Sequence, residues 1–152
     1  MNKILAAVDI GGTKVTVSLA DRERILAKVY QLTEKKGENT AVPAQIDRLI
    51  SHCCDLLNID KEEILGIGVS ACGPFERKDD TYVLKAANIC GGNSEHREIT
   101  PNNWTEIPLQ SELYNFYKHL KPKKIRLVND AISAAMAERN YGGARERMIL
   151  HM

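Results

Sequence analysis

The sequence contains no long hydrophobic segment and no excess of charge of one sign. No apolar run approaches the roughly 20 residues that a membrane-spanning helix needs. The 21 Lys and Arg residues nearly balance the 20 Asp and Glu residues, so the formal net charge is +1, and both signs are mixed along the chain. These properties argue against a membrane or a nucleic acid as the main partner. The 152 residues suffice for one domain with a substantial core.

The cysteines form no metal-binding pattern, because no CxxC or Cys/His spacing occurs among Cys53, Cys54, Cys72 and Cys90. Cys53 and Cys54 are adjacent in a predicted helix, where they would pack as small apolar groups. Cys90 shares a polar loop with His96, but two candidate ligands do not make a zinc site. Reduced thiols in a cytoplasmic protein are the simplest account, so we expect a cytoplasmic location.

The common nucleotide-binding fingerprints are also missing from the glycine-containing segment near the start. Residues 4–20 are two apolar runs around Gly11 and Gly12, a pattern typical of two strands joined by a tight hairpin turn. The segment lacks the Gly-Lys-Ser/Thr ending of a Walker A loop, and no helix pattern follows it as a Rossmann fingerprint requires.

The residues around this turn nevertheless have the chemistry of a phosphate-binding site. Glycines allow positive φ and leave no side chain over the turn, so backbone N–H groups can approach a polyanion. Thr13 adds a hydroxyl, Lys14 adds a cation, and Asp9 could hold a magnesium ion through water. A plain hairpin with solvated Asp9 and Lys14 needs no ligand and explains the segment equally well.

The hydrophobic periodicity of the whole chain predicts an α/β fold. The order of elements indicates a mixed five-stranded sheet with helices on both faces, antiparallel at first and parallel later. After the first two strands we expect strands at 24–32, 64–70, 125–128 and 147–152, a minor strand at 82–84, a long loop at 88–103, and helices starting at the cap Thr40, at 107–120 (with Phe116 and Tyr117 inward) and at 131–140.

Polar residues and glycines occur where the main predicted strands end. Asp9 ends the first, Gly73 follows the fourth, and Asn129 and Asp130 follow the fifth. Ligands of open α/β sheets bind at the carboxyl ends of parallel strands. A carboxylate placed there can orient a hydroxyl and take its proton during phosphoryl transfer. Asp130 could instead be a helix N-cap that needs no ligand, and this alternative stays open.

Four separated motifs carry a family resemblance: DIGGTK at 9–14, GIGVSACGP at 66–74, ANI at 87–89 and VNDA at 128–131. In order and spacing they resemble the N-terminal lobe of the ROK family, which comprises glucokinase-like sugar kinases and related repressors. The resemblance implies an actin-like ATPase, ribonuclease H-like lobe. It also implies transfer of the γ-phosphate of ATP to a hexose hydroxyl, with glucose as the first candidate and N-acetylated hexosamines as the next.

The resemblance also implies roles for single residues. Asp130 would be the catalytic base. Asn88 and Asn129 would hydrogen-bond the sugar, and Gly73 would let the backbone approach the sugar ring. The cofactors would be ATP and Mg, bound by a phosphate loop of Gly11, Gly12, Thr13 and Lys14, with Asp9 facing the metal.

The implied domain organisation is a lobe at 1–146 with a sugar-binding loop at 88–106, and residues 147–152 as the start of a second lobe that is absent. In the family, that second half supplies a second phosphate loop, the adenosine pocket and further sugar ligands. We therefore expect an incomplete kinase that is inactive alone. Residues 91–103 form an insertion relative to the family pattern, and it leaves the identity of the sugar undetermined.

Two other functions remain open: a sugar-sensing ROK-type regulator lobe without a DNA-binding domain, or another actin-like phosphotransferase. A repressor of this family carries a helix-turn-helix ahead of the phosphate loop, for which the early first strand leaves no room, and it would not need Asp130. The expected partners are a hexose and the missing C-terminal lobe, with no nucleic acid and no membrane. The sequence leaves open whether the complete protein forms a homodimer.

Overall fold

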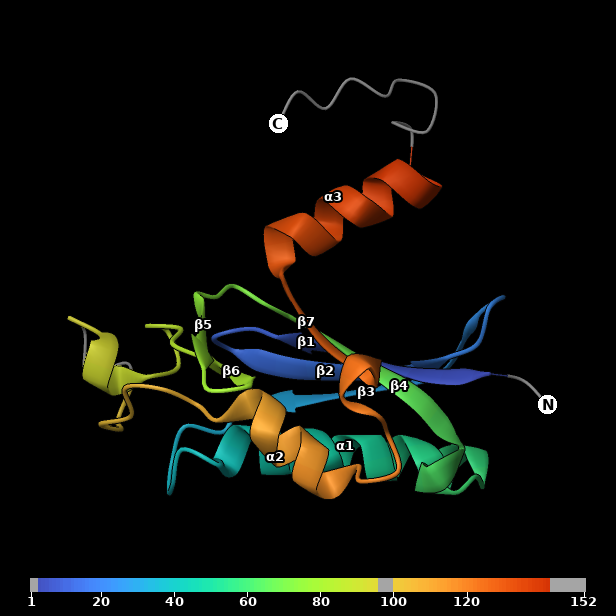
Figure 1. The fold of residues 1–152 in the computed structure, drawn as a ribbon, viewed down its shortest axis with the longest axis horizontal. Coiled ribbons are helices and arrows are strands. Elements are labelled where there is room, and N and C mark those ends of the chain that lie inside the picture. Colours follow the sequence, from blue (N-terminus) through green and yellow to red (C-terminus); the bar gives the residue numbers. More distant parts are fainter. Residues whose placement is uncertain (1–2, 96–99, 143–152) are drawn as a thin grey trace.

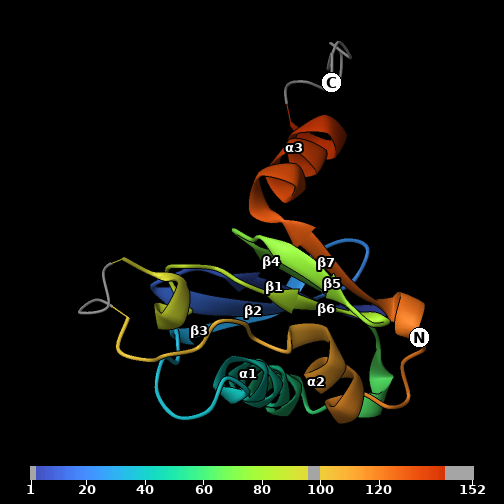
Figure 2. The same cartoon turned by 60° about the vertical axis from the view of Figure 1, so that its left-hand side comes forward.

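The protein is built on a mixed five-stranded sheet with the strand order β3-β2-β1-β4-β7. In the computed structural model, which describes residues 3–95 and 100–142, β1, β2 and β3 are antiparallel neighbours, and β4 and β7 run parallel to β1. Helices α1 and α2 lie on one side of the sheet and α3 on the other (Figures 1 and 2), so the predicted fold class is confirmed. The bounds are β1 (Ile4–Ile10), β2 (Lys14–Ala20), β3 (Ile25–Leu32), α1 (Ala41–Leu57), β4 (Ile64–Ala71), β5 (Phe75–Lys78), β6 (Thr81–Leu84), α2 (Leu109–Phe116), β7 (Ile125–Asn129) and α3 (Asp130–Tyr141).

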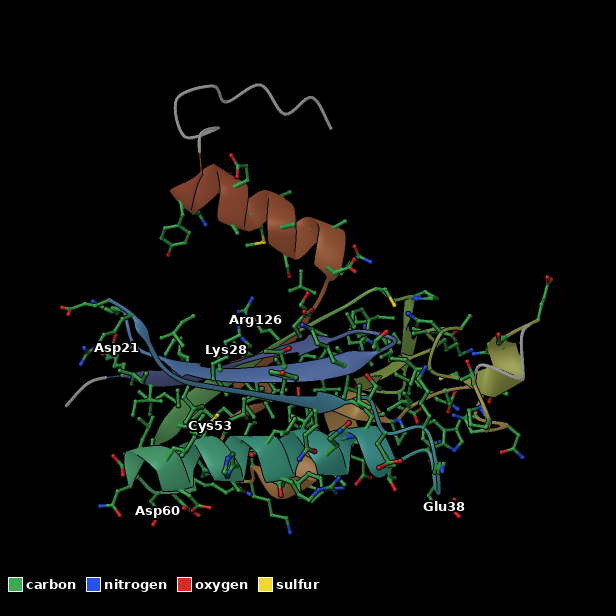
Figure 3. The ribbon with its side chains drawn as sticks, turned by 180° about the vertical axis from the view of Figure 1, so that it is seen from behind. Asp21, Lys28, Glu38, Cys53, Asp60 and Arg126 are labelled. Carbon is green, nitrogen blue, oxygen red and sulfur yellow. The ribbon has the colours of Figure 1, made fainter. Side chains whose placement is uncertain are left out.

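The main core lies between the sheet and α1. Successive side chains of a strand point to opposite faces, and the residues of β1 are alternately buried and exposed from Ile4 to Ile10. The buried face of β1 and β2 meets the apolar stripe of α1, where Cys53 and Cys54 are buried as predicted (Figure 3). Each large side chain buried in this way contributes about 1.5–3 kcal/mol. The predicted stripe is buried at Val42, Ile46, Leu49, Ile50 and Cys53, with Leu57 at its margin.

The opposite face of the sheet is polar and largely open. Asp9 of β1 and Lys28 of β3 are exposed on it, and Figure 3 shows Lys28 and Arg126 on the side turned away from α1. Helix α3 stands on this side but buries none of its residues. None of the helices in the described part of the chain combines the length and the apolar character needed to cross a membrane.

Helix α2 is shorter than predicted. It ends at Phe116, and Tyr117 adopts φ −120° and ψ 56°, outside helical geometry. This change lets the Tyr117 ring enter the core, where it is fully buried, whereas Phe116 is 39% exposed. The prediction that Phe116 faces inward was therefore wrong, since a continued helical period was assumed where the chain leaves the helix.

Two other local predictions also need correction. The single minor strand at 82–84 is one arm of a two-stranded hairpin, in which β5 pairs with β6. Thr40 precedes α1 as predicted, but its side chain makes no capping hydrogen bond, because its backbone is itself helical at φ −87° and ψ −2°. The strand predicted at 147–152 lies outside the described residues.

The Tyr117 hydroxyl ties α2 to α1, which gives a stability prediction. It donates to Asp47 Oδ1 over 2.9 Å, and the pKa of Tyr117 is raised by burial and by the neighbouring Asp47 carboxylate. Asp47 also pairs with Lys61. We expect Tyr117→Phe to lower the free energy of unfolding by about 1 kcal/mol, the typical value of one hydrogen bond.

Urea denaturation measures this loss. Tyr141→Phe is the matched control, because Tyr141 is 89% exposed. An equal change in both variants would show that the bond to Asp47 contributes nothing.

Candidate functional site

A cavity of about 640 Å³ lies between the open face of the sheet and α3. We call it the sheet cavity. Its polar lining comes from four strands and one helix, because every second residue of each strand points to this face. The cavity therefore brings together Asp9 and Asp130, which are 121 positions apart in the sequence. Asp9 was predicted to face the magnesium ion and Asp130 to act as the catalytic base. The polar lining residues are Asp9, Lys14, Thr16, Ser18, Lys28, Ser70, Asp130 and Ser133.

Asp9 is exposed at the carboxyl end of β1, where it pairs with Thr16 of β2 and with Ser70 of β4. Mg²⁺ keeps much of its water shell and binds through one or two carboxylates together with phosphates. An exposed carboxylate flanked by hydroxyls fits that donor set, and the cations of Lys14 and Lys28 in the same cavity suit the phosphates. Among the described residues, no group of three His, Cys, Asp or Glu side chains is arranged to hold a metal ion by itself.

The glycine turn closes as a hairpin, with Gly11 N donating to Lys14 O over 2.9 Å. Neither Gly11 nor Gly12 has a positive φ, so this part of the sequence argument was wrong. The glycines are needed for space instead. A Cβ on Gly12 would lie 2.7 Å from Asn88 Nδ2, and one on Gly11 would lie 3.2 Å from Lys14 O. Thr33 braces the turn by donating its hydroxyl to Gly11 O over 2.7 Å.

Asn129 is the N-cap of α3, and Asp130 is the first residue of the helix. Asn129 Oδ1 accepts from Ala131 N over 3.0 Å, while its Nδ2 donates to Cys72 O over 2.9 Å. Asp130 Oδ1 accepts from the same Ala131 N over 2.7 Å. The N-cap position left open for Asp130 is thus taken by its neighbour. The Asp130 side chain is exposed and lines the sheet cavity.

Gly73 follows β4 beside this cap. Its φ of +73° favours glycine, and a Cβ there would lie 3.3 Å from Asn129 Nδ2. Cys72 connects this region to Asn88, which was predicted to bind the sugar. The Cys72 thiol donates to Asn88 Oδ1 over 3.5 Å. Asn88, Cys72 and Asn129 therefore form one connected chain of contacts.

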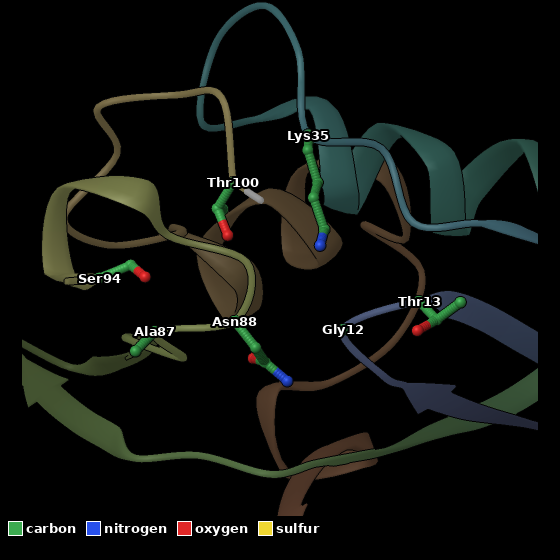
Figure 4. Close-up of a pocket in the computed structure, with 7 residues that line it drawn as sticks. All are labelled: Gly12, Thr13, Lys35, Ala87, Asn88, Ser94 and Thr100. Atoms are coloured by element: carbon green, nitrogen blue, oxygen red, sulfur yellow. The ribbon is translucent and has the colours of Figure 1, made fainter. Parts of the chain in front are cut away.

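A second cavity of about 480 Å³ lies on the other side of the glycine turn. We call it the loop pocket. Gly12 and Thr13 form one wall, Ala87, Asn88 and Ser94 another, and Lys35 and Thr100 enter from two further loops (Figure 4). Six of the predicted residues line the two cavities, with Asp9, Lys14 and Asp130 in the sheet cavity and Gly12, Thr13 and Asn88 in the loop pocket. Gly11, Gly73 and Asn129 are among the lining residues of neither.

The predicted long loop is ordered by Asn102 in its described part. Asn102 Oδ1 accepts from Gly91 N and Trp104 N, and its Nδ2 donates to Lys35 O and Ile89 O. His96 lies outside the described residues. Burial, with smaller contributions from the charges of Glu106 and Cys72, raises the pKa of Cys90 to about 11. The Cys90 thiol is thus protonated at neutral pH.

Sequence reasoning missed several lining residues. In β2, Thr16 and Ser18 alternate with buried Val15, Val17 and Leu19, so a period-of-two analysis could have assigned them to the open face. Lys35 gave no such signal, since it stands in a polar loop after β3. Lys28 and Ser70 line the sheet cavity, and Lys35, Ser94 and Thr100 line the loop pocket.

The fold is that of an actin-like ATPase lobe, as comparison with solved structures shows. The crystal structure of ROK hexokinase from Thermus thermophilus superposes with a TM-score of 0.65 at 24% identity, over 90% of this chain and 38% of that one. A ROK family glucokinase from Streptomyces griseus, solved with glucose and AMPPNP, gives a TM-score of 0.60 at 22% identity, over 93% of this chain and 38% of that one.

The sequence model of the ROK family matches residues 5–149, so the chain belongs to the ROK family. A ROK family transcriptional regulator, a homologue of the E. coli MLC protein, also superposes, with a TM-score of 0.62 at 14% identity over 93% of this chain and 31% of that one. No curated protein matches the chain. The chain spans about 38% of the length of the two kinases.

Proposed function

We propose that this chain is the N-terminal lobe of an ATP-dependent hexose kinase that transfers the γ-phosphate to a sugar hydroxyl, with glucose as the reference acceptor. One observation carries the proposal. Asp9, Lys14 and Asp130 line a single cavity, and the loop pocket with Asn88 lies directly across the glycine turn. This arrangement offers a place for phosphates beside the Asp130 carboxylate and a place for an acceptor in the neighbouring pocket.

On the acceptor side, Asp130 takes the proton of the attacking hydroxyl as general base. Its carboxylate is exposed to the cavity and is oriented by the Ala131 N–H. Asn129 and Asn88 hold the sugar through their amides, and Cys72 keeps the two asparagines in register through its backbone oxygen and its thiol. Gly73 leaves room for the backbone to approach the sugar ring.

On the phosphate side, the backbone of Gly11, Gly12 and Thr13 approaches the phosphates, and Lys14 supplies charge. Lys28 adds a second cation from β3. When bound, Mg²⁺ neutralises the charge that develops on the transferring phosphoryl group. Asp9 is the carboxylate of this chain that would hold the ion through water. The ROK glucokinase from Streptomyces griseus was solved with AMPPNP, an observation consistent with ATP as the donor.

A second lobe is part of the proposal. The chain spans about 38% of the related kinases, and α3 buries none of its residues although Ile132 and Met136 are apolar. Residues 1–146 would be one lobe, with 88–106 as its sugar-binding loop and 147–152 leading to the next. The partners would be a hexose and this second lobe in a cytoplasmic enzyme, and a homodimer would form only from the complete protein.

Ligand mapping on the 152-residue chain tests the proposal. In ¹⁵N NMR titrations, glucose should shift amide signals of Gly73, Asn88 and Asn129, and Mg-AMPPNP should shift those of Gly11–Lys14. A coupled assay of ADP release should show negligible turnover by the chain alone. Robust turnover would refute the need for a second lobe, and absence of shifts at either cavity would refute the assigned site.

A sugar-sensing regulator lobe is the second candidate, because the regulator superposes with a TM-score of 0.62, close to that of the hexokinase. Another actin-like phosphotransferase is a third. A regulator would bind sugar in the loop pocket but would not need Asp9, Lys14 and Asp130 around one cavity. Sugar shifts without any Mg-AMPPNP shifts would favour the regulator.

A further inference from the structure

The loop pocket holds a positive charge but no acidic side chain among its described lining residues. Lys35 reaches into it, and Figure 4 shows the Lys35 side chain and the Thr100 hydroxyl directed toward the same space. The other polar groups are the hydroxyls of Thr13 and Ser94 and the amide of Asn88. Among the described residues, the ion pairs join Lys61, Arg77, Lys78 and Lys85 to carboxylates and leave Lys35 unpaired.

The backbone of Lys35 is fixed on both sides without any ligand. Lys35 O accepts from Asn102 Nδ2 over 3.0 Å. The preceding Glu34 N donates to Gln45 Oε1 over 3.0 Å, and Gln45 is only 2% exposed. Two residues further, Gly37 O accepts from Trp104 Nε1 over 2.9 Å. These bonds fix where the Lys35 side chain leaves the backbone, so the ammonium group can reach only a limited region around the loop pocket.

An ammonium group has three donors and no acceptor, and it binds carboxylate or phosphate oxygens more strongly than neutral hydroxyls. Lys14 and Lys28 already line the sheet cavity, where the phosphates of the nucleotide are proposed to lie. Lys35 stands on the other side of the glycine turn, in the pocket of Asn88. Its charge therefore lies in the pocket proposed for the acceptor, which Gly12 and Thr13 of the glycine turn also line.

We propose that the hexose bound by this protein carries an anionic group, a carboxylate or a phosphate, which Lys35 binds in the loop pocket with Thr100 beside it. This inference rests on the proposed function and narrows its acceptor from a neutral hexose to an acidic one. It also assigns a role to the insertion at 91–103, because Asn102 of that segment donates a hydrogen bond to the backbone oxygen of Lys35.

The test compares glucose, glucuronate, glucose 6-phosphate and inorganic phosphate in ¹⁵N NMR titrations of the 152-residue chain. We expect at least one acidic sugar to bind about tenfold more tightly than glucose, a difference within the range of a charge-assisted hydrogen bond. Lys35→Met should remove this preference, so that the acidic sugars bind no more tightly than glucose does. Lys36→Met is the matched control, because Lys36 is the exposed neighbour and its replacement removes the same charge.

Each outcome decides the matter. Glucose binding as tightly as both acidic sugars, or Lys36→Met acting like Lys35→Met, overturns the inference and leaves the proposed function standing. Inorganic phosphate binding at Lys35 as tightly as the acidic sugars identifies a free-anion site and also overturns it. If no sugar binds the chain, both the proposed function and this inference fail. Unchanged amide signals of the buried strands show that Lys35→Met is folded.

Discussion

Replacing Asp130 by asparagine is expected to lower sugar phosphorylation by about 10²–10⁴-fold, the usual contribution of a general base. Asparagine keeps the size of the side chain and can still accept the Ala131 N–H, which Asp130 Oδ1 accepts over 2.7 Å. It cannot take the proton of the attacking hydroxyl. The sugar affinity should therefore stay the same while transfer is lost, which in kinetic terms is a fall in kcat with little change in KM.

The measurement needs turnover, so the chain is combined with the C-terminal half of a ROK hexokinase and ADP release is followed. Ser133→Ala is the matched control, because Ser133 lines the same cavity from the same helix without a proposed proton-transfer role. A regulator lobe would give no transfer with either variant. Retained transfer in Asp130→Asn would remove Asp130 from the mechanism.

Gly91→Ala is expected to be the most disruptive single-methyl change at the site. A Cβ at Gly91 would lie 2.1 Å from Asn102 O and 2.3 Å from Thr100 O, both of them backbone atoms that cannot turn aside. Overpacking of this kind costs about 1–3 kcal/mol. The forced movement of Thr100 should also deform the loop pocket, so sugar binding should weaken together with stability.

Thermal and urea denaturation measure the first effect, and sugar titration measures the second. Gly68→Ala is the control, since a Cβ at this exposed strand position meets nothing within 4 Å. Its free energy of unfolding should rise by about 0.5–1 kcal/mol, the usual gain when alanine replaces glycine within a strand. If Gly91→Ala were as stable as Gly68→Ala, the packing of the loop against residues 100–102 would be wrong.

Much of the fold could be predicted because the hydrophobic pattern is local and regular. The apolar stripe on α1 requires one orientation of the helix on the sheet, and it lies as predicted. The end of α2 could not be predicted in this way. Phe116 and Tyr117 are adjacent aromatic residues, and the departure from helical geometry that buries one and exposes the other depends on contacts with Asp47 and Lys61 from distant parts of the chain.

The candidate site could likewise be predicted only where local sequence pattern decides the position of a residue. Asp9, Asn129 and Asp130 were found because strand ends carry ligands in α/β sheets, and the structure brings Asp9 and Asp130 to one cavity. The reason for the glycines was missed, because the side chain that comes close to Gly12 belongs to Asn88. Lys35 was missed because its placement depends on Asn102, 67 positions away.

The bare surface of α3 has a consequence for how an active enzyme would come into being. A helix of 12 residues with no buried side chain is marginal in water by itself. Its first turn is held through Asn129 and Cys72. The free energy that stabilises the remaining turns of α3 would come from a surface that packs against the helix. Asp130 lies in the first turn, where the Ala131 N–H already orients its carboxylate, so assembly would stabilise the turns of the helix that follow the proton acceptor.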